Sequence, residues 1–210
     1  MQEPQLDVRL RPVPLTEWPR EMKDALAPVI SPTPRPEGTP KGMNVLGTFA
    51  HHPSLARAFH VFIGHVLYAT TLSARQREIL IVRVGATRGA YYEWAQHVVL
   101  GREAGLTRAE IAALSGDGDG EVRWSPLDAA LIRAVDDLIA DARIADDTWA
   151  ALAAEMSTEQ ILDVICTVGG YDMLAMIMRS AGIELDADLR AWIDAYAAAE
   201  QAGVAGPDGR

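Results

Sequence analysis

The chain is poor in cysteine and in basic residues, and both shortages restrict its function. A single cysteine, Cys166, excludes an intrachain disulfide and suits a reducing cytosol. Its apolar neighbours predict that it is a small buried hydrophobe. Only 19 Lys and Arg residues stand against 29 Asp and Glu residues, which gives a formal net charge of -10. Because an acidic surface repels nucleic acid and anionic membranes, we expect a small-molecule ligand instead.

Long apolar runs and a leader sequence are also missing. No apolar run approaches the ~18 residues that suggest a membrane span, and residues 1–7 lack the basic and apolar regions of a signal peptide. These features predict a cytoplasmic protein with no membrane partner. Hydrophobic residues make up 49% of the chain, which is ample for a packed core in 210 residues.

Proline is concentrated at one end of the chain. Nine of the 12 prolines lie in the first forty residues, which prevents long regular structure there apart from a short helix near residues 17–26. We therefore expect an N-terminal arm over residues 1–42 that wraps over the body or over a neighbouring subunit. A helical domain over residues 43–198 follows, and the glycine-rich segment 199–210 is expected to be a flexible tail.

Helix signals recur through this domain, and no alternating polar and apolar run flanked by turns is present, so the predicted fold class is all-α. Ser125 followed by Pro126 marks one helix start, and Gly105 and Gly182 fit helix ends. Three further starts fit a capping box, in which a Ser or Thr precedes a Glu or Gln by three residues: Ser73 with Gln76, Thr107 with Glu110, and Ser157 with Gln160.

A weak internal repeat relates the two parts of the domain. Leu-Ser-x-x-Gln at residues 72–76 aligns with Met-Ser-x-x-Gln at residues 156–160. This alignment predicts two similar helical halves, over about residues 43–115 and 125–198. The repeat breaks where the first half has its candidate chemistry, because Leu162 stands at the position of a glutamate.

Glu78, Glu93 and His97 form the candidate catalytic site. Residues four apart share one face of a helix, so Glu93 and His97 are expected to form a carboxylate–imidazole pair. Glu78 belongs to the preceding apolar segment, from which a second helix can point another carboxylate at the same ring. Three titratable groups in apolar surroundings indicate acid–base chemistry. The alternative is an ordinary Glu–His pair on a solvated face, but its apolar flanks are unusual for such a face.

Three patterns carry a family resemblance: Leu-Ser-x-Arg-x-Arg-Glu at 72–78, Gly-Ala-x-Tyr-Glu-Trp-x-x-His at 89–97 and Gly-Leu-Thr-x-x-Glu-Ile at 105–111. Together they resemble the carboxymuconolactone decarboxylase family of the alkylhydroperoxidase D-like superfamily. The resemblance implies that superfamily's helical fold. It also implies a homo-oligomer, either a trimer or a hexamer.

The resemblance also separates two chemistries. The peroxidase branch of the superfamily carries Cys-x-x-Cys-x-x-x-His, and here Ala90 and Glu93 stand at its two cysteine positions. Without these thiols, a dithiol peroxidase cycle is unavailable. The decarboxylase branch implies a cofactor-independent lyase of aromatic-compound metabolism that removes carbon dioxide from a carboxylated lactone and protonates the product. His97 would then be the proton donor, with Glu93 orienting its ring and Glu78 relaying the proton or holding the second ring nitrogen.

Other residues are candidates for substrate binding. The planar guanidinium of Arg83 suits a substrate carboxylate, although an ion pair with a site glutamate fits equally well. Tyr92 and Trp94 are candidates for walls of a flat substrate pocket, or else for core or subunit contacts. His52 either lines the mouth of the site or caps a helix. No metal is predicted, because no His, Cys, Asp or Glu cluster has convincing ligand spacing.

The sequence therefore favours a cofactor-independent enzyme that decarboxylates or isomerises a small carbonyl compound. Two other functions stay open. One is peroxide handling, which the missing cysteine pair disfavours, and the other is a non-catalytic oligomeric protein that binds a ligand.

Overall fold

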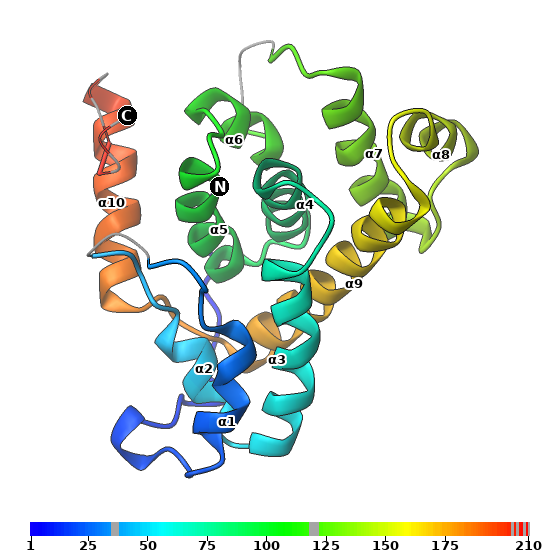
Figure 1. The fold of residues 1–210 in the computed structure, drawn as a ribbon. Coiled ribbons are helices and arrows are strands. Elements are labelled where there is room, and N and C mark those ends of the chain that lie inside the picture. Colours follow the sequence, from blue (N-terminus) through cyan, green and yellow to red (C-terminus); the bar gives the residue numbers. More distant parts are fainter. Residues whose placement is uncertain (35–37, 118–121, 203, 205, 208, 210) are drawn as a thin grey trace.

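The computed structural model describes residues 1–34, 38–117, 122–202, 204, 206, 207 and 209. Within them the protein is all-α and has no strand, which confirms the predicted fold class. Helix α4 lies at the centre of the fold, with α5, α6, α7 and α9 around it (Figure 1). The helices are α1 Met22–Leu26, α2 Met43–Phe49, α3 Pro53–Tyr68, α4 Ala74–Thr87, α5 Tyr91–Glu103, α6 Arg108–Ser115, α7 Pro126–Asp141, α8 Asp146–Ala153, α9 Thr158–Ala181 and α10 Ala187–Ala202, with short 3-10 turns η1 Leu15–Glu17 and η2 Ala27–Val29.

The local helix signals in the sequence are present in the structure. All three expected capping boxes form, at the starts of α4, α6 and α9. Ser125 caps α7 as expected, and Gly182 ends α9 in the left-handed conformation, with φ of 68°. Helix α10 runs to Ala202, into the segment expected as a tail, and residues 203, 205, 208 and 210 of that segment lie outside the described residues.

Helix α4 is central because four consecutive apolar residues in its middle cover every side of the helix there. Its residues from Ile79 to Val82 are all 0% exposed, and the neighbouring helices cover them. A helix with this pattern belongs in the interior of a helical protein. Glu78 begins this stretch and is also 0% exposed, so its carboxylate needs partners inside the protein.

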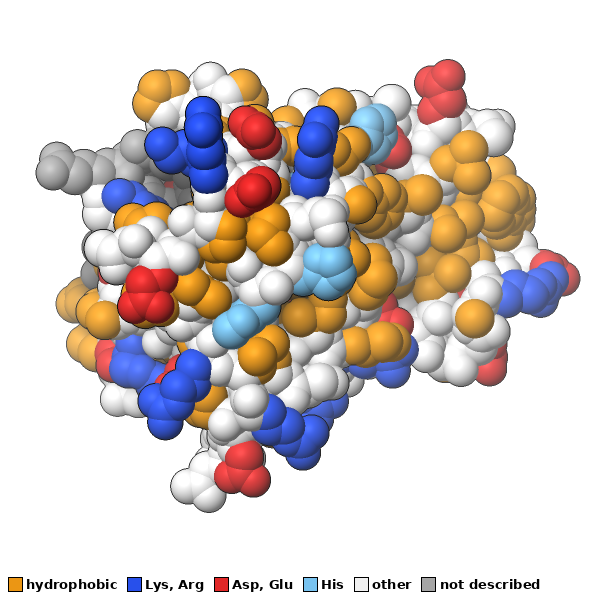
Figure 2. Space-filling view, turned by 90° about the horizontal axis from the view of Figure 1, so that it is seen from below, with side chains coloured by type: hydrophobic (Ala, Val, Ile, Leu, Met, Phe, Trp, Pro, Cys, Tyr) orange, Lys and Arg blue, Asp and Glu red, His pale blue; other side chains and the backbone are white. Residues whose placement is uncertain are grey.

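Helix α9 is long and apolar enough to cross a membrane by length and composition, with a mean hydropathy of 1.6 over its most apolar window. Half of that window is buried in the fold, where α9 packs on α3, α4, α7 and α8, as the core helix of a helical protein does. Its outer face carries Leu162, Cys166, Met173 and Met176. In Figure 2, hydrophobic side chains gather on the side of the molecule where α8 and α9 lie.

The expectation of a buried Cys166 is therefore wrong. Cys166 lies four residues after Leu162, so the two share the outward face of α9. The apolar neighbours that suggested burial, such as Val164 and Val168, point to the opposite side of the same helix and are buried. Apolar flanks do not distinguish the two faces of a helix that is hydrophobic all round.

The N-terminal arm packs over the body at three glycines that leave no room for a side chain. A Cβ at Gly47 would lie 2.8 Å from the carbonyl oxygen of Val13. A Cβ at Gly64 would collide with the carbonyl of Pro28, and one at Gly182 with the carbonyl of Asp7. The backbone N–H of Val13 also donates to the carbonyl of Gly47 at 3.0 Å. Close backbone contact of this kind fixes the path of the arm across the fold.

We expect Gly64→Ala to displace the arm near Pro28, because the new methyl group would collide with its backbone. Overpacking of this kind costs about 1–3 kcal/mol, and thermal unfolding together with limited proteolysis of the arm measures it. Gly169→Ala is the matched control, since Gly169 is also helical but a Cβ there meets nothing within 4 Å. Equal proteolysis and equal stability of the two variants would show that the arm does not depend on Gly64.

Candidate active site

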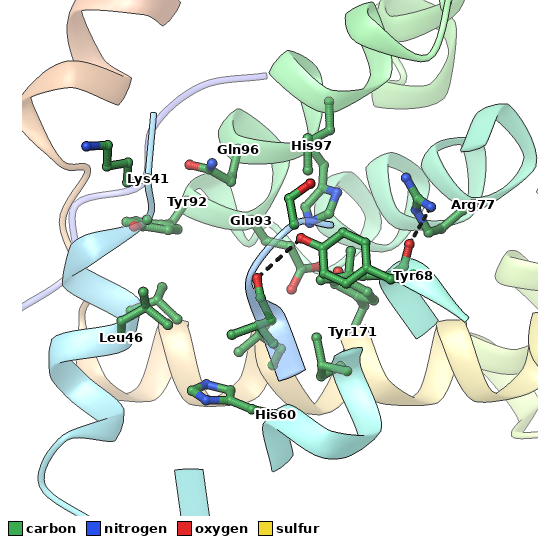
Figure 3. Close-up of a pocket in the computed structure, with 18 of the residues that line it drawn as sticks. Lys41, Leu46, His60, Tyr68, Arg77, Tyr92, Glu93, Gln96, His97 and Tyr171 are labelled. Carbon is green, nitrogen blue, oxygen red and sulfur yellow. Dashed lines mark hydrogen bonds between the residues drawn. The ribbon is translucent and has the colours of Figure 1, made fainter. Parts of the chain in front are cut away.

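A cavity of about 480 Å³ lies between the N-terminal arm, α3, α5 and α9. The arm contributes Val29 and Ser31 to its wall, and α9 contributes Tyr171. Most of the wall is apolar, and the polar groups gather on the side formed by α5 (Figure 3). A largely apolar cavity with a few converging polar groups is the usual form of a small-molecule site.

Helix α5 presents one face to this cavity. Glu93, Gln96, His97 and Leu100 all line it, at the spacing that places residues on one side of a helix. Figure 3 shows Glu93, Gln96 and His97 side by side along α5. Helix α4 lies close behind, because a Cβ at Gly85 would be only 3.0 Å from the backbone nitrogen of Trp94. This close crossing of α4 and α5 allows side chains of α4 to reach His97.

Glu78 of α4 holds the imidazole of His97. The Glu78 Oε2 atom lies 2.7 Å from the His97 Nδ1 atom, and Arg77 Nε donates to Glu78 Oε1 at 2.9 Å. Arg77 is fixed in turn by an N–H donated to the carbonyl of Leu67 at 2.7 Å. Burial favours a raised pKa for the Glu78 carboxyl, but the charges and hydrogen bonds of His97 and Arg77 outweigh burial and lower this pKa. Glu78 is therefore ionised.

The charge on Glu78 decides the arrangement of the His97 ring. An ionised carboxylate only accepts hydrogen bonds, so the Nδ1 of His97 must carry the hydrogen that lies between them. The Nε2 atom is then the ring nitrogen left to accept or deliver a proton. This arrangement, a histidine oriented by a buried carboxylate, is the one that general acid–base catalysis requires.

The expected pair between Glu93 and His97 is not formed. Neither carboxyl oxygen of Glu93 has a hydrogen-bond partner among the residues that the structure describes, although the side chain is 0% exposed. Burial, together with the negative charge of Asp172, raises the pKa of Glu93 well above its ordinary value. Burial therefore favours the neutral acid form of Glu93 in the folded protein. The shared helix face brings Glu93 and His97 to one cavity, but Glu78 from the neighbouring helix takes the Nδ1 atom.

Two side chains that the sequence analysis did not assign to the site also contact it. Tyr171 of α9 packs edge-on against the His97 ring, with centroids 4.8 Å apart, and burial raises the pKa of its hydroxyl well above the ordinary value. His60 of α3 has its Nδ1 atom 2.9 Å from the carbonyl oxygen of Ala25. Burial lowers the pKa of His60, more than the hydrogen bond raises it. Both side chains are therefore neutral at neutral pH.

The family model of the carboxymuconolactone decarboxylase family matches residues 53–136, the segment that holds α3 to α6 and the Glu78–His97 pair. Through this segment the chain is similar to the carboxymuconolactone decarboxylase family. No curated protein matches the chain in sequence.

Solved structures show the same alkylhydroperoxidase D-like fold. A debrominase, Bmp8, solved as a single-site variant in complex with 2,3,4-tribromopyrrole, superposes with a TM-score of 0.70 at 13% identity and covers 91% of this chain and 98% of its own. A protein of unknown function from Agrobacterium tumefaciens, described as a candidate AhpD antioxidant defence protein, has a TM-score of 0.60 at 21% identity over 66% of this chain and 94% of its own. An uncharacterised peroxidase-related protein from Silicibacter sp. TM1040 has a TM-score of 0.63 at 17% identity over 70% of this chain and 78% of its own.

No thiol is present among the described residues that line the cavity. The positions that resemble the cysteine pair of the peroxidase branch are Ala90 and Glu93, and the sole cysteine is Cys166 on the outer face of α9. A thiolate that attacks a bound ligand must reach the cavity. The described cavity wall instead offers Glu93 at that point.

Three residues expected in the substrate site lie outside the cavity wall. Arg83 binds Asp136 through two hydrogen bonds of 2.8 and 3.1 Å, because five residues along a helix turn it away from the face of Glu78. The indole N–H of Trp94 donates to Ser115 at 2.7 Å, and the His52 side chain caps α3. Tyr92 does lie in the wall, and its hydroxyl donates to Asp186.

No group of three or more His, Cys, Asp or Glu residues that could hold a metal ion is found among the described residues. The absence of a resident metal and of a cofactor stays a prediction.

Proposed function

We propose that the cavity is the active site of a cofactor-independent acid–base enzyme of the carboxymuconolactone decarboxylase type. The enzyme would decarboxylate or isomerise a small carboxylated lactone or other carbonyl compound, and His97 would carry the proton. One observation carries this proposal: His97 lines a largely apolar cavity, and Glu78 binds its Nδ1 atom at 2.7 Å from behind the cavity wall. With Nδ1 held by Glu78, the Nε2 atom is the ring nitrogen that can exchange a proton with carbon.

The surroundings of His97 suit this chemistry. Arg77 neutralises the charge of Glu78, so the pair is balanced without the substrate. The arm and α9 contribute apolar residues to the cavity wall, among them Val29 and Leu174. Electrostatic effects and hydrogen bonds are stronger in such a site than in bulk water.

Two alternatives are less well supported. A peroxidase needs a thiolate at the cavity, and the sole cysteine lies on the outer face of α9. A non-catalytic binding protein would fit the cavity, but it has no use for a histidine that a buried ion pair orients. We also propose a cytoplasmic location, a place in aromatic-compound metabolism and a homo-oligomeric state. The exposed apolar residues of α9 support the last of these.

Incubation of the protein in D₂O with carboxylated unsaturated lactones and β-keto acids tests the proposal. We expect carbon dioxide release or a double-bond shift, with deuterium incorporated at the carbon that receives the proton. No turnover and no deuterium uptake with any member of the panel would contradict an acid–base enzyme and favour a binding protein.

We expect Cys166→Ala to leave this turnover unchanged within about twofold, because the thiol lies outside the cavity. Thiol alkylation of the wild-type protein serves as a second readout. A loss of activity in both experiments would show that the reaction depends on the thiol.

A further inference from the structure

The cavity contains polar atoms that no described residue satisfies. Both carboxyl oxygens of Glu93 and the Oε1 atom of Gln96 are buried and have no hydrogen-bond partner among the described residues. The amide nitrogen of Gln96 donates to the carbonyl of Pro40 at 3.0 Å, which orients the amide. Buried polar groups in native proteins are normally paired. A ligand in the cavity is the natural partner for these atoms.

The protonation states define what that ligand must offer. The Oε1 atom of Gln96 accepts, so its partner must be an O–H or N–H group of the ligand. A fully buried carboxyl group without a partner favours its neutral form, in which the hydroxyl of Glu93 donates and its partner is an acceptor such as a carbonyl oxygen. Glu93 and Gln96 lie three residues apart on one face of α5, so a single small molecule can contact both.

The charges around the cavity favour a neutral ligand. Arg77 donates to Glu78 and to the carbonyl of Leu67, so its guanidinium is engaged within the protein. Arg83 lies outside the cavity wall and pairs with Asp136. Lys41 reaches the wall from the arm, but it is exposed, and in Figure 3 its ammonium group points away from Glu93 and His97. A carboxylate beside His97 would therefore lack the cation that such a group needs.

We infer that the cavity binds a neutral, ring-sized carbonyl compound with a nearby O–H or N–H group and shifts its double bond through a dienolate, with Glu93 as the hydrogen-bond donor to the carbonyl. The inference rests on the proposed acid–base function. Of the two reactions proposed there, it favours isomerisation over decarboxylation. The apolar wall, which includes Phe49, Phe59 and Leu174, suits a flat ring.

The proposed step is balanced without a further reactant. The Nε2 of His97 removes a proton from the carbon between the carbonyl and the double bond, and the C–H electron pair becomes the new double bond of a dienolate. The carbonyl π pair moves to the oxygen, and the hydroxyl of Glu93 stabilises its negative charge by donating a hydrogen bond. The protonated His97 then returns the proton to the far carbon of the dienolate, the carbonyl re-forms, and the double bond is conjugated with it.

The test compares Glu93→Gln with Glu93→Leu on a panel of cyclic β,γ-unsaturated ketones and lactones, followed by the absorbance of the conjugated product. A glutamine amide can still donate a hydrogen bond to the carbonyl, so we expect Glu93→Gln to stay within about tenfold of the wild type. Leucine cannot donate, and we expect a loss of about 10²–10³ in kcat for Glu93→Leu, as for loss of one oxyanion donor. Equal, near-complete losses in both variants would overturn the inference, because they would identify Glu93 as an ionised base.

A second readout needs no substrate. Because the folded pKa of Glu93 is raised, its contribution to stability is full below the unfolded pKa and is lost as pH rises toward the folded pKa. Relative to Glu93→Gln, the wild-type folding equilibrium constant should fall about tenfold per pH unit above pH 4.5. The contrary result is a ratio of the two folding equilibrium constants that stays constant between about pH 5 and pH 8, with the two proteins about equally stable. This result would contradict a neutral Glu93.

The outcomes separate the inference from the function on which it rests. Carbon dioxide release from carboxylated lactones, with no double-bond shift in any neutral compound, would refute the inference and leave the proposed acid–base function in place. Turnover of neither class, with no deuterium uptake, would refute both. A double-bond shift in neutral compounds that persists in Glu93→Gln and is lost in Glu93→Leu would support both the inference and the proposed function.

Discussion

Replacement of His97 by glutamine is expected to lower kcat by about 10²–10⁴-fold, the usual contribution of a positioned acid–base group. The His97 ring is held by Glu78 on one side and packed edge-on by Tyr171, so the amide of glutamine can fill part of its volume. It cannot carry a proton between two carbons. Steady-state turnover and deuterium uptake from D₂O measure the loss.

His65→Gln is the matched control for this experiment. His65 lies in α3 with its side chain 55% exposed, and it contacts only the carboxylate of Asp163, at 3.5 Å, among the interactions found for the described residues. Exposed pairs of this kind contribute little to stability. We expect the activity of His65→Gln to match that of the wild type. Comparable losses of activity in both variants, or wild-type activity in His97→Gln, would place the chemistry elsewhere.

The second large effect is expected from Glu78→Gln, which should destabilise the fold by roughly 3–5 kcal/mol and remove most of the activity. Glu78 is fully buried and accepts from both Arg77 and His97, so its removal leaves a largely buried guanidinium without its counter-charge. Denaturant unfolding at neutral pH measures the change. Glu155→Gln, on an exposed glutamate, is the control and should unfold as the wild type does.

The pH dependence of this effect has a defined sign. The folded pKa of Glu78 is lowered, so the stability that it contributes is present above its unfolded pKa and is lost as pH falls through the folded pKa. The difference between wild type and Glu78→Gln should therefore shrink in acid. If the stability difference between the two proteins stays constant down to the pH of acid unfolding, the charge of the ion pair does not contribute to stability.

The sequence predicted those features that depend on neighbouring residues. The three capping boxes and the end of α9 at Gly182 were all recognisable because helix caps are local hydrogen-bond patterns. The all-α class followed from the same signals. The convergence of Glu78 and His97 could be expected, since Glu78 belongs to an apolar segment that must be buried next to its neighbour helix.

The features that the sequence did not predict depend on packing between helices. Glu93 and His97 share a face of α5, but the spacing could not show that Glu78 would occupy the histidine Nδ1. Arg83 was assigned to the site by chemistry, yet its position on α4 directs it to Asp136. Tyr171 reaches the site from α9, which belongs to the second half of the domain. No local signal in the sequence connects Tyr171 to His97.

The most direct test of the His97 assignment is the ¹⁵N NMR spectrum of its imidazole ring, recorded on protein labelled at histidine and assigned with His97→Gln. We predict that Nδ1 of the neutral ring carries the hydrogen, which Glu78 accepts at 2.7 Å, and that Nε2 is the nitrogen without a hydrogen. A neutral ring with its hydrogen on Nε2 would contradict this arrangement, since Glu78 could not then accept from Nδ1 and the cavity would face no proton acceptor on His97.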